Sequence, residues 1–168
     1  MIRTSMITPS SDRRYNIEKN IAKRFKKVLV AGCYTYEPIV LGASHACDIN
    51  GIFIESLKKN GYKGEAKIAD IRKLPYADDF FDCVFCTETL EHLETLDDVK
   101  LAISEILRVG DKFFISVPAR KSPNAKTHYQ QFTIKTLSAL LPEGSRVWIH
   151  EGFIFATNIP EVSDVHKV

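Results

Sequence analysis

The sequence predicts an α/β protein, with a mostly parallel sheet and helices packed on both of its faces. Strand-like and helix-like segments alternate along most of the 168 residues, and this order produces parallel strands joined by crossover helices. The chain is 45% hydrophobic and 26% charged, an ordinary globular composition that excludes a disordered or coiled-coil protein. Its length is enough for one domain with its own core.

The first half of the chain shows five elements. In order, they are a helix over 13–25, strands over 27–32 and 44–49, a helix over 52–59 and a strand over 66–71. Ser11 or Asp12 is expected to cap the first helix, whose apolar residues recur on one face. Asn60-Gly61 is expected to end the helix over 52–59. Only 15 residues separate Gly32 from Asp48, so any helix between them has one or two turns.

The second half continues the alternation. Its expected elements are a strand around 83–86, a helix over 97–108, a strand over 112–117, a helix holding Leu137, Leu140 and Leu141, and strands over 146–149 and 153–156. Residues 109–111 form the turn before the strand at 112. Thr133 is placed to cap the late helix, and Gly152 favours a bend or hairpin between the last two strands.

The chain is expected to be a single domain over 1–168, with an N-terminal segment at 1–25 that holds a basic helix, a core at 26–158 and a flexible tail at 159–168. Its apolar runs are only a few residues long, which excludes a membrane span. The first residues are polar and lack the apolar core of a signal peptide, so a cytoplasmic protein is expected.

Opposite charges concentrate in two regions although the net charge is only +2. Residues 1–30 hold eight basic and two acidic side chains, a local charge of +6, whereas residues 78–111 hold ten acidic and two basic ones, a local charge of −8. One interpretation is solvated helix faces. The other is a basic helix near a site that receives an anionic acceptor. No run of Lys and Arg is dense enough to make nucleic acid the default partner, though it stays open.

Four cysteines stand at positions 33, 47, 83 and 86. Cys83 and Cys86 form a C-x-x-C pattern, for which a zinc or redox site is the alternative interpretation. Their segment reads as a buried strand, on which residues three apart point to opposite faces. We therefore predict four reduced core cysteines.

Ligands of such sheets bind at the carboxyl ends of the strands, where the strand order reverses. Asp48 ends the second expected strand, where its carboxylate can accept both hydroxyl protons of a ribose. The alternative is a cap for the helix that follows. Asp70 ends the third strand and can accept from an adenine amino group, or it is a turn aspartate. Gly32 allows the backbone to approach a ligand closely.

Together these residues resemble a known family, the class I S-adenosylmethionine-dependent methyltransferases. The resemblance covers roughly residues 26–142 and is closest to the small single-domain group that includes ubiquinone-biosynthesis O-methyltransferases. It rests on KVLVAGC, ACDIN, Asp70 with Leu74-Pro75, Phe81-Asp82, Leu90-Glu91-His92, Glu105 with Arg108, and Ser116-Val117-Pro118. It implies a three-layer Rossmann-like sheet of seven strands in the order 3-2-1-4-5-7-6, with the last strand antiparallel.

The resemblance also implies a cofactor, S-adenosylmethionine, with S-adenosylhomocysteine as the product. Its methyl group would pass to an oxygen or nitrogen nucleophile of an unidentified acceptor. Thr87 would line the methyl-transfer side together with Glu88. The expected cofactor contacts are Gly32, Cys33 and Tyr34 near the methionine half, Asp48 and Ile49 near the ribose, and Asp70 and Ile71 near the adenine.

An oxygen acceptor needs a base, or a metal that lowers its pKa. His92 is the first candidate for the base, with Glu88, Glu91 and His128 as assistants. These four residues also resemble the metal site of small-RNA 2′-O-methyltransferases, so a divalent ion is an open alternative. Another is that Glu91 and His92 orient the loop or cap the next helix. We assign no metal ligand from the sequence.

The first motif departs from the family pattern of an acid followed by G-x-G-x-G. Val30 replaces the acid, and Tyr34 and Tyr36 replace the second and third glycines. Two functions therefore remain open. One is a working methyltransferase with a remodelled first loop. The other is a catalytically degenerate protein that acts as a binding or regulatory module, for instance as the partner of an active enzyme. A nucleotide-binding oxidoreductase is disfavoured because the chain has no G-x-G-x-x-G.

The acceptor site is expected to be open, because the predicted elements leave no room for an added substrate domain. Arg120, Lys121 and Lys126 follow the strand at 112–117 and would stand at its mouth. Together with the basic helix, they would attract an anionic acceptor. Neutralising Arg120 and Lys121 should then weaken acceptor binding and leave cofactor binding unchanged.

Overall fold

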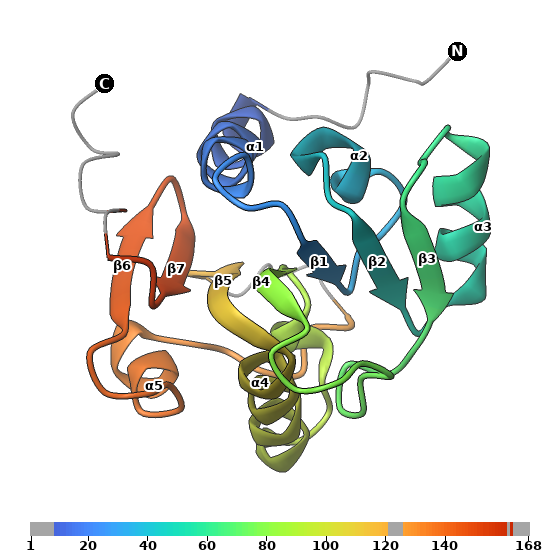
Figure 1. Cartoon of the computed structure of the whole chain (residues 1–168). Coiled ribbons are helices and arrows are strands. Elements are labelled where there is room, and N and C mark those ends of the chain that lie inside the picture. The colour runs from blue at the N-terminus through green and yellow to red at the C-terminus, as the bar shows by residue number, and fades with distance from the viewer. Residues whose placement is uncertain (1–8, 121–125, 161, 163–168) are drawn as a thin grey trace.

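The computed structural model describes residues 9–120, 126–160 and 162. It shows a seven-stranded sheet between two layers of helices (Figure 1). The strand order is β3-β2-β1-β4-β5-β7-β6. The neighbours from β3 to β5 run parallel, and β7 is antiparallel to both β5 and β6. This confirms the predicted fold class and strand order.

The elements follow one another in the predicted alternation. In chain order they are α1 (Pro9–Ala22), β1 (Val28–Ala31), α2 (Glu37–Leu41), β2 (His45–Asp48), α3 (Gly51–Lys59), β3 (Glu65–Ile68), β4 (Phe81–Thr87), the 3₁₀ turn η2 (Leu90–His92), α4 (Leu96–Val109), β5 (Gly110–Pro118), α5 (Ile134–Ser138), β6 (Arg146–His150) and β7 (Phe153–Thr157). The short α2 lies between β1 and β2, where the close spacing of the two strands leaves room for only one or two helical turns.

The two faces of the sheet bury separate apolar clusters. One cluster gathers residues of α1, α2 and α3, and the other gathers residues of α4 and α5. Phe85 and Phe114 are fully buried on the first face, whereas Val84 and Phe113 are buried on the second. Successive side chains along β4 and β5 point to opposite faces of the sheet, and this alternation produces the division. It also places Cys83 and Cys86 in different clusters, as their strand spacing predicts.

Local sequence signals position the helices of the second half. Thr95 and Asp98 form a reciprocal capping box at the start of α4, and Thr133 caps α5 in the same way. α5 ends at Ser138, which leaves Leu140 and Leu141 beyond it. The turn expected at 109–111 is absent, because β5 begins at Gly110 directly after α4. A Cβ at Gly110 would overlap the Val84 side chain.

The last two strands form a β-hairpin. Their connection is Glu151-Gly152, and both residues have positive φ, 50° and 86°. This is the backbone of a tight two-residue turn, and it confirms the bend expected at Gly152. Beyond β7, Ile159 and Val162 are buried against the α1 face, so the core extends past residue 158.

Two further boundary predictions were wrong. α1 begins at Pro9, so Ser11 and Asp12 lie inside the helix and not at its start. β3 ends at Ile68, which leaves Asp70 and Ile71 in the loop that follows. Both errors arose where no strong local stop signal marks the boundary. Among the described residues, no helix is long and apolar enough to cross a membrane.

Candidate functional site

The sheet reverses its strand order between β1 and β4. β1 leads into α2 on one face, whereas β4 leads through η2 to α4 on the other. The connections therefore separate at the carboxyl ends of these two strands, where open α/β sheets bind their ligands. We call residues 32–36 the Gly32 turn and residues 88–92 the Glu88 loop. The candidate site is built from these two segments and the end of β2.

The Gly32 turn is closely packed against the residues around it. Gly32 has a φ of +78°, and a Cβ at this position would overlap the Thr89 side chain. The Thr89 hydroxyl lies 3.3 Å from the Gly32 carbonyl and 3.0 Å from that of Thr87. The amides of Gly32 and Cys33 donate to the Cys47 carbonyl at 2.9 and 3.1 Å. Only glycine fits here, and Thr89, which sequence reasoning missed, joins the turn to the Glu88 loop.

The two tyrosines of the turn have different surroundings. Tyr34 is 52% exposed, and its ring packs edge-on against Phe53 at a centroid distance of 4.6 Å. Its φ of +44° is in the left-handed region that favours glycine. The Tyr36 ring lies 6.3 Å from that of Tyr15 on α1. Tyr34 thus turns outward, while Tyr36 contacts the N-terminal helix.

Asp48 ends β2 with its carboxylate directed towards the Gly32 turn. One carboxylate oxygen accepts from the Tyr34 amide at 3.3 Å, and the other accepts from the Asn50 amide at 2.8 Å. Asn50 itself caps α3 by accepting from the Ile52 amide at 3.0 Å, so the alternative role of Asp48 as the helix cap was wrong. Burial raises the pKa of Asp48. Each of its oxygens retains capacity for another hydrogen bond.

Asp70 has a well-defined partner in the loop after β3. It accepts from the Arg72 amide at 2.9 Å and forms an ion pair with the Arg72 guanidinium at 2.7 Å. Hydrogen bonding by Arg72 lowers the pKa of Asp70. This is the turn aspartate of the alternative interpretation, and adenine binding by Asp70 stays a prediction. Ile71 is buried in the core, whereas Ile49 is 66% exposed, so Ile49 offers the freer apolar surface.

A group of buried charges that sequence reasoning missed lies beside the switch point. Arg14 and Glu18 of α1 are 7% and 0% exposed, and Glu37 at the start of α2 is 5% exposed. Arg14 pairs with Glu18 at 3.5 Å and with Glu88 at 3.8 Å. We call Arg14, Glu18, Glu37 and Glu88 the Arg14 cluster. In sequence, Arg14, Glu18 and Glu37 resemble the solvated charges of ordinary helices, so no local signal identified them, whereas Glu88 is one of the predicted site residues.

The Arg14 cluster contains three carboxylates and one guanidinium. Burial raises the pKa of Glu18 and Glu37, and it raises that of Glu88 to about 7. The carboxylates in turn raise the pKa of Arg14, against the lowering effect of its own burial. The Thr87 hydroxyl donates to Glu37, so a residue expected to face the cofactor is engaged here. Part of the cluster therefore holds protons near neutral pH.

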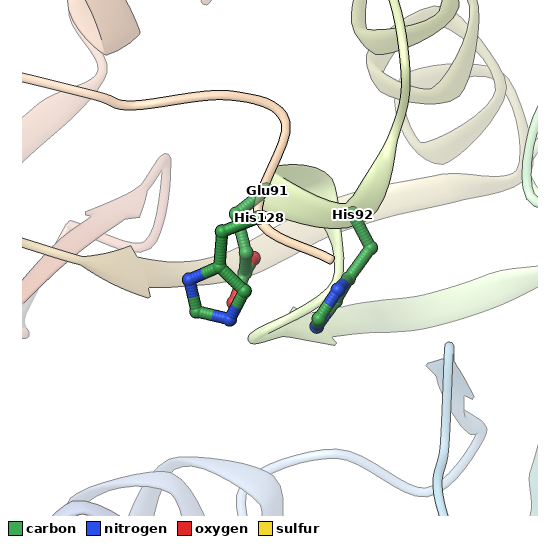
Figure 2. Close-up of side chains that lie close together, drawn as sticks. All are labelled: Glu91, His92 and His128. Carbon is green, nitrogen blue, oxygen red and sulfur yellow. The ribbon is translucent and has the colours of Figure 1, made fainter. Parts of the chain in front are cut away.

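A second cluster contains Glu91, His92 and His128. Their ligand atoms all lie within 4.8 Å of one another. Figure 2 shows the three side chains pointing to the same side, with the two imidazole rings next to each other. The ring centroids are 4.8 Å apart, at 85°. Three of the four predicted catalytic residues therefore meet, whereas Glu88 is directed to Arg14 and to Ser116, whose hydroxyl lies 3.4 Å away.

Backbone hydrogen bonds hold this second cluster together. The Glu91 carbonyl accepts from the amides of Tyr129 and Gln130 at 2.8 and 3.1 Å, which places His128 beside the Glu88 loop. Burial raises the pKa of Glu91 to about 8 and lowers that of His128, with His92 lowering the latter further. α4 is capped by Thr95. The alternative in which Glu91 or His92 caps that helix was therefore wrong.

The basic residues expected at the mouth of the site are only partly described. Arg120 follows β5 and is exposed, and Lys126 is exposed as well. Lys121 lies outside the described residues. A role of these side chains in attracting an anionic acceptor stays a prediction.

The arrangement joins a glycine turn, a carboxylate at the end of β2 and acid–base groups with pKa values near neutrality. A family model described as a methyltransferase domain matches residues 31–113, about half of the chain. The chain belongs to the class I methyltransferases. The matched region runs from the end of β1 into β5 and includes the Gly32 turn, Asp48 and the Glu88 loop of this methyltransferase.

Solved structures show the same fold. The methyltransferase resembles the N-methyltransferase NodS of Bradyrhizobium japonicum with a TM-score of 0.70 and 16% identity, covering 89% of this chain and 96% of that one. NodS has also been solved with S-adenosyl-L-homocysteine. A SAM-dependent methyltransferase of Thermotoga maritima, described as a possible histamine N-methyltransferase, matches with a TM-score of 0.65 and 16% identity, over 86% and 89% of the two chains.

A third similar structure is a methyltransferase described as putative, from Haloferax volcanii, in complex with the Trm112 activator. It matches with a TM-score of 0.68 and 13% identity, over 87% of this chain and 89% of that one. No curated protein matches the chain in sequence. At these identities the structural likeness supports the fold, and the chemistry has to be argued from the residues of this chain.

Proposed function

We propose that this methyltransferase transfers the methyl group of S-adenosylmethionine to an oxygen or nitrogen nucleophile. The proposal rests above all on one observation, the contact of Thr89 with Gly32. This contact places the turn expected to hold the cofactor beside the loop that carries Glu88, Glu91 and His92. Methyl transfer requires such proximity, because donor and acceptor must be aligned for in-line displacement.

The residues at the switch point fit the proposed cofactor. Gly32 has a φ of +78°, and the turn that it forms against Thr89 presents backbone atoms at the carboxyl end of β1. The Asp48 carboxylate keeps capacity to accept from ribose hydroxyls, and Ile49 exposes an apolar surface next to it. When bound, S-adenosylmethionine supplies an electrophilic methyl group on a sulfonium. Its site on this chain would extend from the Gly32 turn to Asp48.

The second cluster supplies groups that can take the proton of the acceptor. The His92 Nδ1 lies 3.0 Å from the Thr127 carbonyl, a contact that favours a proton on Nδ1 and leaves a lone pair on Nε2. His92 is exposed and His128 is half-buried. We infer that His92 Nε2 receives the acceptor proton, and that the neighbouring carboxyl of Glu91 stabilises the imidazolium that results.

The charges of the site restrict the acceptor. The described groups in and beside the Glu88 loop include four carboxyls, those of the Arg14 cluster and Glu91, and the guanidinium of Arg14, which is already paired. These groups offer no partner to an anion, so we infer that the reacting part of the acceptor is neutral or cationic. An anionic part would be held further out, near Arg120 and Lys126.

Calorimetric titration of the chain with S-adenosylhomocysteine tests the cofactor site. We expect saturable binding that Asp48→Ala weakens at least tenfold, because the ribose loses its carboxylate partner. The matched control is Asp97→Ala, which removes an exposed carboxylate on α4 and should leave the affinity unchanged. Absence of binding to the wild-type chain at millimolar ligand would overturn the proposal in favour of a degenerate binding or regulatory module.

If the chain alone does not bind S-adenosylhomocysteine, we propose that it works together with a protein partner. The Haloferax volcanii methyltransferase was solved in complex with an activator protein, so assembly with another chain is compatible with this fold. Sedimentation of the purified chain with and without a candidate partner measures such assembly directly. Binding of S-adenosylhomocysteine only in the presence of the partner would indicate activation.

A further inference from the structure

Three side chains with metal-binding atoms converge on one point beside the Glu88 loop. The carboxylate of Glu91 and the imidazoles of His92 and His128 place their ligand atoms within 4.8 Å of one another. Around a tetrahedral zinc ion, ligand atoms stand about 3.3 Å apart. Small side-chain rotations would therefore bring the three atoms to coordination distance. Figure 2 shows that no change of side is needed, because all three already face the same way.

The Glu91 carboxylate lacks a partner that a buried carboxylate needs. Glu91 is 1% exposed, and its Oε2 atom has no hydrogen-bond partner. A buried carboxylate oxygen without a partner is costly, and a cation between it and the two imidazoles would satisfy it. This observation is independent of the spacing of the three side chains, and it also points to a ligand.

The surrounding backbone orients the His92 imidazole in the way metal-binding histidines are usually oriented. The His92 Nδ1 lies 3.0 Å from the Thr127 carbonyl, which leaves Nε2 available as the ligand atom. The segment carrying His128 is held to the Glu88 loop by amides that donate to the Glu91 carbonyl and by Gln130 Nε2, which donates to the carbonyls of Leu93 and Glu94. Hydrogen bonds that do not depend on an ion thus position the His92 ring and the backbone segments that carry Glu91 and His128.

We propose that Glu91, His92 and His128 bind one divalent transition-metal ion with a preference for imidazole, such as zinc. Two nitrogens and one oxygen suit zinc, whereas Mg²⁺ and Ca²⁺ prefer sites made of oxygen alone. Three protein ligands leave a coordination position open, which is typical of catalytic zinc. His92 is exposed, so this position is accessible to an acceptor. Glu88 is not a ligand, because it contacts Arg14 and Ser116.

The catalytic role of this metal site rests on the proposed function. In that role, the site specifies that the acceptor group is a hydroxyl. A bound ion lowers the pKa of a coordinated hydroxyl, whereas a coordinated amine would have its nucleophilic lone pair occupied. The hydroxyl proton passes to solvent, and the oxygen forms a bond to the methyl carbon. The carbon–sulfur bond breaks, and its electron pair stays on sulfur as the neutral thioether. With the ion bound, His92 Nε2 is a ligand, and the ion takes over the activation of the acceptor that the proposed function assigns to His92 as a base.

The test is titration of the full, tag-free chain with Co²⁺ and Zn²⁺ after treatment with EDTA. We expect one Co²⁺ per chain with the visible absorption of a four-coordinate site, displaced by Zn²⁺ and not by Mg²⁺. His128→Ala and Glu91→Gln should each weaken binding by at least about 10–100-fold, the loss typical of even the outer partners of metal sites. The controls are His150→Ala on β6 and Glu94→Gln, and neither should change the affinity.

A second measurement needs no variant. Zn²⁺ should shift the imidazole resonances of His92 and His128 in the NMR spectrum and leave that of His45 unchanged. Absence of stoichiometric binding, or equal binding by the His128→Ala chain, would overturn the metal site. A parallel titration with S-adenosylhomocysteine separates the two proposals. Cofactor binding without metal binding refutes only the metal site, whereas metal binding without cofactor binding refutes only the proposed methyl transfer.

Discussion

Replacement of Glu91 by glutamine should remove part of the pH dependence of stability. Glu91 is 1% exposed, and burial raises its pKa from 4.5 to about 8. The folded state therefore retains a proton that the unfolded chain releases near pH 4.5. This contribution to stability is present at low pH and is lost as the pH rises through about 8. Between pH 5 and pH 9 the loss amounts to up to about 4 kcal/mol, at 1.36 kcal/mol per pKa unit.

The assay is urea unfolding, followed by circular dichroism at pH 5, 7 and 9 in the presence of EDTA. The wild-type chain should lose stability across this range more steeply than the Glu91→Gln chain. The neutral glutamine adds a cost of its own where its amide is unpaired, but that cost is independent of pH, so the slope is the relevant quantity. Glu94→Gln removes an exposed carboxylate three residues away and should retain the wild-type slope. Equal slopes for wild type and Glu91→Gln would refute the reasoning.

Three further substitutions test the switch point. Arg14→Met should destabilise the chain by about 3–5 kcal/mol in urea unfolding at pH 8, because it leaves buried carboxylates without their cation. The exposed Lys19→Met on the same helix should stay within about 0.5 kcal/mol, and equal effects would contradict a buried pair. Gly32→Ala should lower stability and abolish S-adenosylhomocysteine binding in calorimetry, since its Cβ overlaps Thr89. Tyr34→Gly should retain that binding, because the tyrosine ring lies outward, and loss of binding would show that the ring contributes to the site.

Elements with strong local signals were predicted well from the sequence. α4 has a capping box at Thr95 and an apolar face that is buried in the structure, and the predicted range differs from the observed one by one residue at each end. The start of α5 at Thr133 and the hairpin bend at Gly152 were also predicted. The start of α1 was not, since the polar residues at its beginning fit a cap and a helix equally well. Short-range hydrogen bonding determines where α4, α5 and the hairpin bend lie, whereas tertiary packing decides where α1 begins.

The candidate site was predicted in part. The strand ends identified Gly32, Asp48 and the Glu88 loop, because the ends of parallel strands meet at one edge of the sheet. Arg14 and Glu18 were missed, since an i,i+4 ion pair in a helix usually faces water. Their burial follows from the packing of α1 next to α2. The ion pair of Asp70 with Arg72 was not predicted, and adenine binding by Asp70 stays a prediction.

The sequence by itself determined the order of strands and helices, the family and the positions of the residues that follow the strands. These depend on periodicity, caps and turns, which are properties of neighbouring residues. Only the tertiary structure decided which charges are buried together, which way Tyr34 turns, and that Glu91 and His92 meet His128 while Glu88 does not. Such groupings depend on how distant segments pack, and a pKa near neutrality arises only once that packing removes water from a carboxyl group.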